Sequence, residues 1–224
     1  MDNPVLLLHG FTTSAQRTWI ETGWTDLLAD AGREVIAPDM LGHGSAARPH
    51  DPAAYDIERQ ISDLLPEGPI DAVGYSAGAR VLLSLASQQP SRFDRIVAAG
   101  VGAGLLAPQP TNRIIDAIEE TPAAEDVVAS RFASMSRSDG NDPKALAAFM
   151  RRSQPVLGQE QLALITAKTM VIAGSEDFAG PVEPLAEAIP KAKAVTLQGV
   201  DHFGLPKSFK FLEIALNHLD AAPF

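Results

Sequence analysis

A single serine stands out because of the small residues on either side of it. Ser76 lies in Gly74-Tyr75-Ser76-Ala77-Gly78, which matches the pattern G-x-S-x-G. This pattern is typical of a sharp turn from a strand into a helix, where only very small residues fit because the two backbones pass close together. The turn exposes the serine hydroxyl, and the N-terminus of the following helix favours negative charge beside it. The pattern predicts a nucleophilic serine, but because it recurs in unrelated proteins the context has to decide.

The segments around Ser76 predict the elements that would position it. Short apolar runs, interpreted as buried strands, occur at Val5–Leu8, Glu34–Ala37, Ile70–Val73, Arg95–Ala99, Thr169–Ala173 and Ala194–Leu197. Segments with helical spacing lie between them, at Trp19–Ala31, Ile57–Leu65, Ala77–Gln89, Pro181–Ile189 and Ser208–Leu219. This alternation predicts an α/β fold, a doubly wound and mostly parallel sheet of about six strands flanked by helices. Ligands of such sheets bind beyond the carboxyl ends of the strands, which is where Ser76 falls.

The alternation is interrupted once, between residues 102 and 168. Helical patterns follow one another there without a strand, at Arg113–Glu120, Ala124–Met135, Pro143–Arg152 and Gln159–Ala167. We interpret this segment as a helical cap inserted into a core formed by residues 1–101 and 169–224, since helix-only insertions over α/β sheets commonly form lids. The alternative is an ordinary set of surface helices that closes one edge of the sheet.

Length and composition exclude several classes of protein. A chain of 224 residues that is 46% hydrophobic can bury one sizeable core, so we expect a single domain over residues 1–224. The net charge of −10, with no basic cluster to offset it, argues against nucleic acid and anionic membrane surfaces as partners. Because the chain has no cysteine, it has no disulfide, thiolate metal site or cysteine nucleophile. The sequence contains no signal peptide and no apolar run long enough to span a bilayer, so we expect a cytoplasmic protein.

Several motifs occur in the order that is typical of one family. They read LLLHGF, PDMLGHGSA, GYSAGAR, VIAGSEDF and GVDHFGLP along the chain. On these motifs the chain resembles the α/β-hydrolase fold family, in its serine hydrolase or esterase branch with a helical cap, and the resemblance covers nearly the whole chain. The family places a nucleophile, an acid and a histidine along the chain in that order.

The resemblance implies a catalytic triad of Ser76, Asp177 and His202. His202 follows the last predicted strand, whereas His218 lies inside the terminal helix and is expected to be a core or boundary histidine. Asp177 matches the acid of the G-x-x-D pattern in GSEDF, and Glu176 remains the alternative acid. Asp201 is expected to be a solvated loop carboxylate.

The same resemblance implies an oxyanion hole after the first strand. His9-Gly10-Phe11 is similar to the family's oxyanion loop, so the backbone N–H groups of Phe11 and Ala77 are expected to bind the oxyanion. The ring of His9 is then expected to shape the loop, and His43 and His50 to be loop histidines.

The function implied is a serine hydrolase that cleaves a carboxylic ester or thioester of a small substrate through an acyl-enzyme. We expect no metal and no organic cofactor to be needed. Because relatives with epoxide hydrolase or haloalkane dehalogenase activity place an aspartate at the turn, Ser76 argues against those two chemistries. The sequence leaves the oligomeric state open.

Two alternatives remain. The motif GYSAGAR also resembles the menaquinone-pathway cyclohexadiene carboxylate synthase, a carbon–carbon bond hydrolase or lyase whose arginine at this place helps to hold a substrate carboxylate. That resemblance makes Arg80, with Tyr75, a candidate for substrate binding, against a plain role for Arg80 on the helix surface. Further candidates for anion contacts are the arginines of the predicted cap, Arg113, Arg131, Arg137, Arg151 and Arg152. The second alternative is a non-catalytic ligand-binding protein that keeps the scaffold, because a fold does not fix a function.

Overall fold

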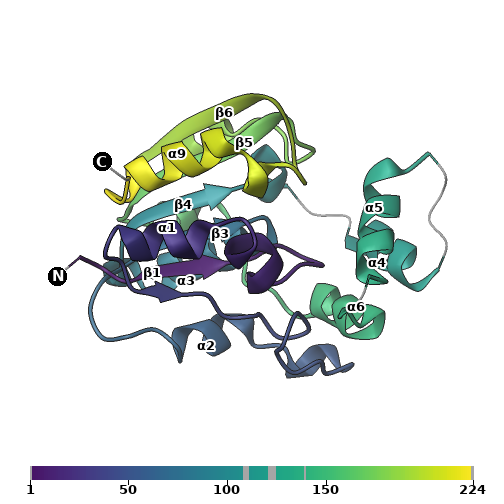
Figure 1. Ribbon diagram of the computed structural model, residues 1–224. Coiled ribbons are helices and arrows are strands. Elements are labelled where there is room, and N and C mark those ends of the chain that lie inside the picture. The colour runs from purple at the N-terminus through teal and green to yellow at the C-terminus, as the bar shows by residue number, and fades with distance from the viewer. Residues whose placement is uncertain (1, 108–110, 121–124, 139, 223–224) are drawn as a thin grey trace.

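The computed structural model describes residues 2–107, 111–120, 125–138 and 140–222, and a sheet of six strands forms its centre (Figure 1). The strands are β1 (Val5–Leu8), β2 (Val35–Ile36), β3 (Ile70–Tyr75), β4 (Phe93–Ala99), β5 (Lys168–Glu176) and β6 (Ala192–Asp201). Their order across the sheet is β2-β1-β3-β4-β5-β6, and every neighbouring pair is parallel. The predicted α/β class with six strands is confirmed.

The central strands β1 and β3 are buried on both faces of the sheet, which explains why they are largely apolar, whereas the edge strand β6 is partly exposed. The strand β1 alternates between two hydrophobic clusters, with Leu6 and Leu8 in one and Val5 and Leu7 in the other. The helices that flank the sheet are α1 (Trp24–Asp30), α2 (Ile57–Ser62), α3 (Ala77–Gln88), α8 (Glu183–Glu187) and α9 (Phe209–His218). Short helical turns join them at η1 (Gln16–Ile20), η2 (Pro52–Ala54), η3 (Pro90–Arg92) and η5 (Leu205–Lys207). These helices and turns cover the sheet at whose carboxyl edge the predicted site lies.

Several element boundaries differ from the sequence-based prediction. The helix expected over Trp19–Ala31 is two pieces, η1 and α1, because Gly23 between them has a φ of +80°, which an α-helix cannot accommodate. Strand β2 has only two residues, whereas β5 and β6 extend beyond their apolar runs. The helix expected at Pro181–Ile189 is shorter in the structure, where it is α8.

The segment from residue 102 to 167 contains helices and, in its described part, no strand, and Lys168, the last residue of the predicted insertion, begins β5. Its elements are η4 (Ala103–Leu106), α4 (Thr111–Glu119), α5 (Val127–Ser136), α6 (Pro143–Arg151) and α7 (Gln159–Leu162). Helix α5 starts later than expected, and Ala124 lies outside the described residues. Figure 1 shows α4, α5 and α6 beyond the ends of the strands to which the arrowheads point. The assignment of these helices to a cap within a single domain stays a prediction.

Candidate active site

Ser76 occupies the turn between β3 and α3. Its φ of 55° and ψ of −115° are rarely adopted by residues other than glycine, so the turn holds this serine in a strained conformation. A Cβ on Gly74 would lie 2.6 Å from the Cα of Ala79, and one on Gly78 would collide with the backbone of Leu8. The two glycines are therefore required because strand and helix backbones touch at this turn.

Two other loops at the same edge of the sheet bring a histidine and an aspartate to Ser76. His202 follows β6, and its Nε2 lies 3.0 Å from Ser76 Oγ. Asp177 follows β5, and its two carboxylate oxygens lie 2.9 and 3.0 Å from His202 Nδ1. His202 is 3% exposed and Asp177 9%, so little water competes for these hydrogen bonds. The three residues form one continuous hydrogen-bonded chain.

The backbone around the imidazole fixes its place. The Tyr75 hydroxyl donates a hydrogen bond of 2.7 Å to the His202 carbonyl, and burial raises the pKa of that phenol, which therefore stays protonated. Asp177 Oδ1 accepts a hydrogen bond of 2.8 Å from the Ala179 N–H. The ring of Phe178 lies against the imidazole, with centroids 4.2 Å apart and ring planes tilted by 38°. No pattern in the sequence predicts this contact, although Phe178 directly follows the predicted acid.

Two other acids are adjacent in the sequence to Asp177 and His202, and both have different surroundings. Glu176 is exposed, and Asp177 is the carboxylate at hydrogen-bonding distance from the His202 ring. Asp201 accepts a hydrogen bond from the Gly204 N–H and lies 3.7 Å from Arg131. Both carboxylates therefore have the surface positions that suit a solvated acid.

The other histidines are engaged in local contacts. His9 is buried, its Nε2 accepts a hydrogen bond from the Met40 N–H, and its Nδ1 donates to the Gly10 carbonyl. Burial lowers the pKa of His9, and burial lowers the pKa of His43 to about 3, so both rings are neutral. His50 pairs with an acid, and His218 donates to a main-chain carbonyl.

Phe11 and Ala77, the expected oxyanion donors, lie beside Ser76 in the wall of one cavity. Ala77 is the first residue of α3, so its N–H has no acceptor within the helix. Phe11 follows β1 and is fixed by stacking on Phe149, with centroids 5.8 Å apart. Both backbone segments are therefore rigid, while their role as oxyanion donors stays a prediction.

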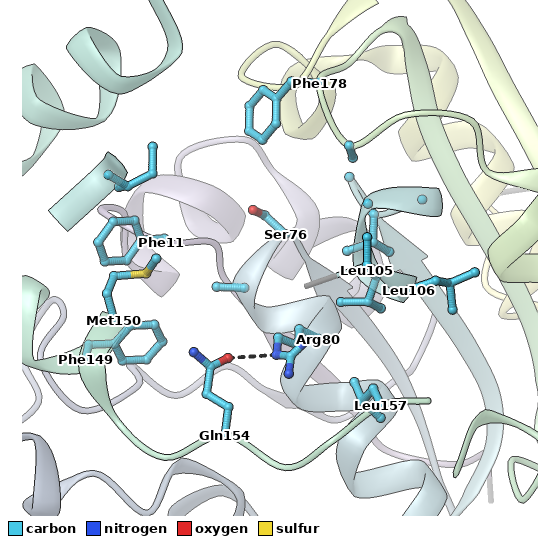
Figure 2. A pocket seen from close by; sticks show the side chains of 18 of the residues that line it. Phe11, Ser76, Arg80, Leu105, Leu106, Phe149, Met150, Gln154, Leu157 and Phe178 are labelled. Atoms are coloured by element: carbon cyan, nitrogen blue, oxygen red, sulfur yellow. Dashed lines mark hydrogen bonds between the residues drawn. The ribbon is translucent and has the colours of Figure 1, made fainter. Parts of the chain in front are cut away.

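The cavity measures about 820 Å³, and His202 lies in its wall. Ser76 also lies in this wall (Figure 2). Most of the remaining lining is apolar, including Leu105, Phe132, Phe149, Met150, Leu157 and Phe178. A cavity of this size and composition is typical of a site for a small organic molecule.

Three arginines interrupt the apolar wall of this cavity, and one of them, Arg151, is paired with Glu119. Arg80 Nε donates a hydrogen bond of 2.7 Å to Gln154 Oε1, and Arg80 Nη2 donates one of 3.1 Å to the Pro155 carbonyl (Figure 2). Arg152 is 6% exposed, stacks over the Phe149 ring at 3.7 Å, and its Nε has no hydrogen-bond partner among the described residues. Burial lowers the pKa of Arg80, and burial lowers that of Arg152 to about 10, so both are charged at neutral pH.

Neither guanidinium forms an ion pair with a carboxylate in the described part of the chain, and Glu58 is the acid whose charge acts on both. The other arginines from the predicted cap are paired. Arg113, Arg131 and Arg151 form ion pairs, and Arg137 donates hydrogen bonds to main-chain carbonyls. From the sequence, Arg80 is a candidate because of its motif. Arg152 is one of five arginines in the predicted cap, and nothing along the chain distinguishes it from the other four.

Two further properties concern only the described residues. No group of three or more histidine, aspartate or glutamate side chains there is arranged to hold a metal ion. None of the described helices combines the length and the apolar character that crossing a membrane requires.

Comparison with known proteins identifies the family of this fold. The family model described as alpha/beta hydrolase fold matches residues 3–126. The chain belongs to the α/β-hydrolase family.

The curated relatives include several hydrolases. The chain is 29% identical over 218 residues to a 2-hydroxymuconate semialdehyde hydrolase of Pseudomonas putida, covering 85% of this chain and 77% of that protein. It is 34% identical over 106 residues to a 2-hydroxy-6-oxo-2,4-heptadienoate hydrolase of Pseudomonas putida, and 44% identical over 70 residues to epoxide hydrolase A of Mycobacterium tuberculosis. The last two alignments span only 37% and 20% of those relatives.

A solved structure of similar fold is a 2-hydroxy-6-oxo-6-phenylhexa-2,4-dienoate hydrolase from a Rhodococcus strain. It has a TM-score of 0.72 at 21% identity and covers 99% of this chain and 91% of its own. Est816, described as an N-acyl homoserine lactone degrading enzyme, has a TM-score of 0.70 at 22% identity, over 97% and 93% of the two chains. At these identities the likeness concerns the fold.

Proposed function

We propose that this chain is a serine hydrolase that cleaves a carboxylic ester or thioester of a small substrate through an acyl-enzyme. The observation that carries the proposal is the hydrogen-bonded chain from Ser76 Oγ through the His202 ring to Asp177. A nucleophile, a base and a group that orients the base, each at hydrogen-bonding distance from the next, are the arrangement that activates a hydroxyl.

In the first half-reaction, Ser76 Oγ attacks the carbonyl carbon of the substrate. His202 Nε2 takes the hydroxyl proton, while Nδ1–H keeps its hydrogen bond to Asp177. That hydrogen bond enforces the tautomer in which Nε2 carries the lone pair, and the carboxylate stabilises the imidazolium that forms. The imidazolium then gives its proton to the leaving alcohol or thiol, and the acyl group remains on Ser76.

The negative charge on the carbonyl oxygen needs donors that are already in place. The N–H groups of Phe11 and Ala77 would supply them, and the N-terminus of the twelve-residue helix α3 adds a favourable dipole. Loss of one such donor costs about 2.7–4 kcal/mol of barrier in serine hydrolases. In the second half-reaction a water replaces the alcohol, His202 takes its proton, and the acid product leaves with Ser76 restored. None of these steps needs a metal or an organic cofactor.

Hydrolysis of p-nitrophenyl butyrate tests the proposal. We expect the wild-type protein to release p-nitrophenol with an initial burst, and Ser76→Ala to abolish the burst and the turnover. Ser175→Ala is the matched control, because this hydroxyl accepts a hydrogen bond from the Gly199 N–H and does not contact His202. Equal activity in wild type and Ser76→Ala would refute the proposal, and an inactive but folded wild-type protein would favour a non-catalytic scaffold.

A second candidate function is hydrolysis of a carbon–carbon bond in a substrate that carries a carboxylate. It is favoured by Arg80 and Arg152, two charged guanidinium groups in the cavity without a carboxylate partner in the described chain. Relatives whose names specify a dienoate or a muconate semialdehyde also support it. Loss of the dienoate absorbance of 2-hydroxy-6-oxo-2,4-heptadienoate on incubation with the protein would establish this activity. Rapid ester hydrolysis with a stable dienoate would exclude it for that substrate.

A further inference from the structure

A second cavity reaches the same serine from a different side. It measures about 630 Å³, and it shares Ser76, His202, Phe11 and Phe132 with the larger cavity described above. Its other walls come from the segment around η1, from α5, and from the loop and helix that follow His202. The nucleophile therefore lies where two cavities meet.

The lining of this second cavity combines apolar side chains with hydroxyl groups and a net positive charge. The charged side chains in it are Arg17, Arg131, Lys207 and Glu21, and hydroxyl groups come from Thr13, Thr18, Thr22 and Ser208. Arg131 lies 4.3 Å over the Phe203 ring and 3.7 Å from Asp201, which lies outside the lining and offsets part of its charge. The larger cavity also carries arginines, Arg80, Arg151 and Arg152, but Ser76 is the only residue with a hydroxyl group in its described lining.

The geometry of acyl transfer requires two such spaces. A tetrahedral carbon on Ser76 Oγ carries an oxyanion, an acyl chain and a leaving group, and the last two diverge from one another. The leaving group must also lie near His202 Nε2, which gives it a proton. The second cavity is formed in part by the loop that carries His202, from Phe203 to Ser208. Of the two cavities, only this one is lined by the residues that directly follow His202.

We propose that the second cavity binds a leaving group that bears negative charge, a carboxylate or a phosphate, while the larger cavity binds the acyl part. This rests on the proposed function, since both parts belong to one substrate cleaved at Ser76. Local cations matter here because the chain has a net charge of −10 and would otherwise repel an anionic alcohol.

The test compares esters that share a butyryl group and differ in the alcohol. The alcohols are phenol, 4-hydroxybenzoate and 4-hydroxyphenyl phosphate, so the last two distinguish a carboxylate from a phosphate. A fourth ester, monophenyl glutarate, carries its anion on the acyl side. For each ester, kcat/KM of a variant is divided by that of the wild type, which removes differences in the intrinsic reactivity of the esters.

The variants remove one positive charge each. We expect Arg17→Gln and Lys207→Gln to lower kcat/KM for esters of an anionic alcohol by about two- to fivefold each, and together by about tenfold, as for exposed ion pairs. The loss should shrink as salt is added. The neutral phenyl ester and monophenyl glutarate should change far less. Lys210→Gln is the matched control, because this exposed lysine in α9 pairs with Glu213 and does not line the cavity.

Equal losses for all four esters, a loss confined to monophenyl glutarate, or no loss would overturn the proposal. A measurement without turnover separates it from the proposed function. Binding of 4-hydroxybenzoate to Ser76→Ala, followed by NMR line broadening, should weaken when Arg17→Gln and Lys207→Gln are added, and should not weaken with Lys210→Gln. If the wild-type protein hydrolyses no ester, the proposed function fails, and this binding measurement alone decides whether the cavity takes an anion.

Discussion

Both carboxylate oxygens of Asp177 lie within hydrogen-bonding distance of His202 Nδ1, at 2.9 and 3.0 Å. One of the two oxygens also accepts a hydrogen bond from the Ala179 N–H, so the carboxylate cannot rotate away without losing a second contact. The orientation of the imidazole is thus fixed by a group that is itself fixed.

This relationship predicts a clear difference between two neighbouring acids. Asp177→Asn keeps the shape of the side chain but no longer enforces the tautomer of His202, so we expect kcat for ester hydrolysis to fall by about 10⁴-fold. Glu176→Gln should change kcat little, because the Glu176 side chain is exposed. Steady-state kinetics of both variants, with thermal unfolding as the control for folding, check this. The opposite ranking would make Glu176 the acid.

A second prediction concerns Phe178, which is 48% exposed although its ring lies against the buried imidazole. An aromatic face beside the ring shields it from water and favours the imidazolium formed during the reaction, an interaction of about 0.5–2 kcal/mol. We expect Phe178→Leu to lower kcat by about two- to thirtyfold with a smaller change in KM, and Phe178→Tyr to restore it. A Leu variant with the kcat of the wild type would show that the aromatic ring contributes only apolar surface.

A third prediction separates a substrate-binding role of Arg80 from a structural one. If Arg80 and Arg152 hold a substrate carboxylate, Arg80→Ala should raise KM for monophenyl glutarate far more than for phenyl butyrate. Loss of an exposed ion pair would raise KM only about two- to fivefold, and we expect a larger rise because Arg80 is partly buried. Equal effects on the two esters would mean that Arg80 serves only to hold Gln154 and Pro155 in place.

A fourth prediction concerns acid stability. Burial lowers the pKa of His43 from 6.5 to about 3, so below pH 6.5 the unfolded chain binds a proton that the folded chain does not. The free energy of unfolding that this site contributes is therefore fully present above pH 6.5 and is lost as the pH falls. Between pH 6.5 and 5 the loss is about 2 kcal/mol. Urea unfolding at pH 7.5 and 5 should show a smaller decrease for His43→Gln than for the wild type, and equal decreases would contradict the assignment.

The centre of the sheet could be predicted from the sequence because its strands are buried on both faces. Runs such as Val5–Leu8 and the core of β5 are apolar at successive positions, and the turns between them carry Gly, Pro or Asp. The boundaries of helices were harder to predict. The break at Gly23 depends on a positive φ in an amphipathic stretch, and a periodic pattern shows the apolar face without showing where the chain turns.

The site could be predicted in part for a similar reason. Ser76 lies in a local motif whose glycines are required because a larger residue would collide with the backbone. Its position at the turn could therefore be predicted from a few neighbouring residues. Asp177 and His202 were found through resemblance to a family. Arg152 was not singled out, because its burial depends on contacts with Phe149 that only the folded helices create. The second cavity has walls from three distant segments, and no pattern along the chain marks it.

The central claim, that Ser76 is an activated nucleophile, is tested most directly by covalent labelling with a fluorophosphonate. The hydroxyl of Ser76 has a base at 3.0 Å, and we expect intact-protein mass spectrometry to show one added phosphonyl group and peptide mapping to locate it on Ser76. Ser76→Ala should remain unlabelled under the same conditions, and Ser175→Ala should be labelled like the wild type. Labelling that persists in Ser76→Ala, or a wild-type protein that stays unmodified while folded, would contradict the account.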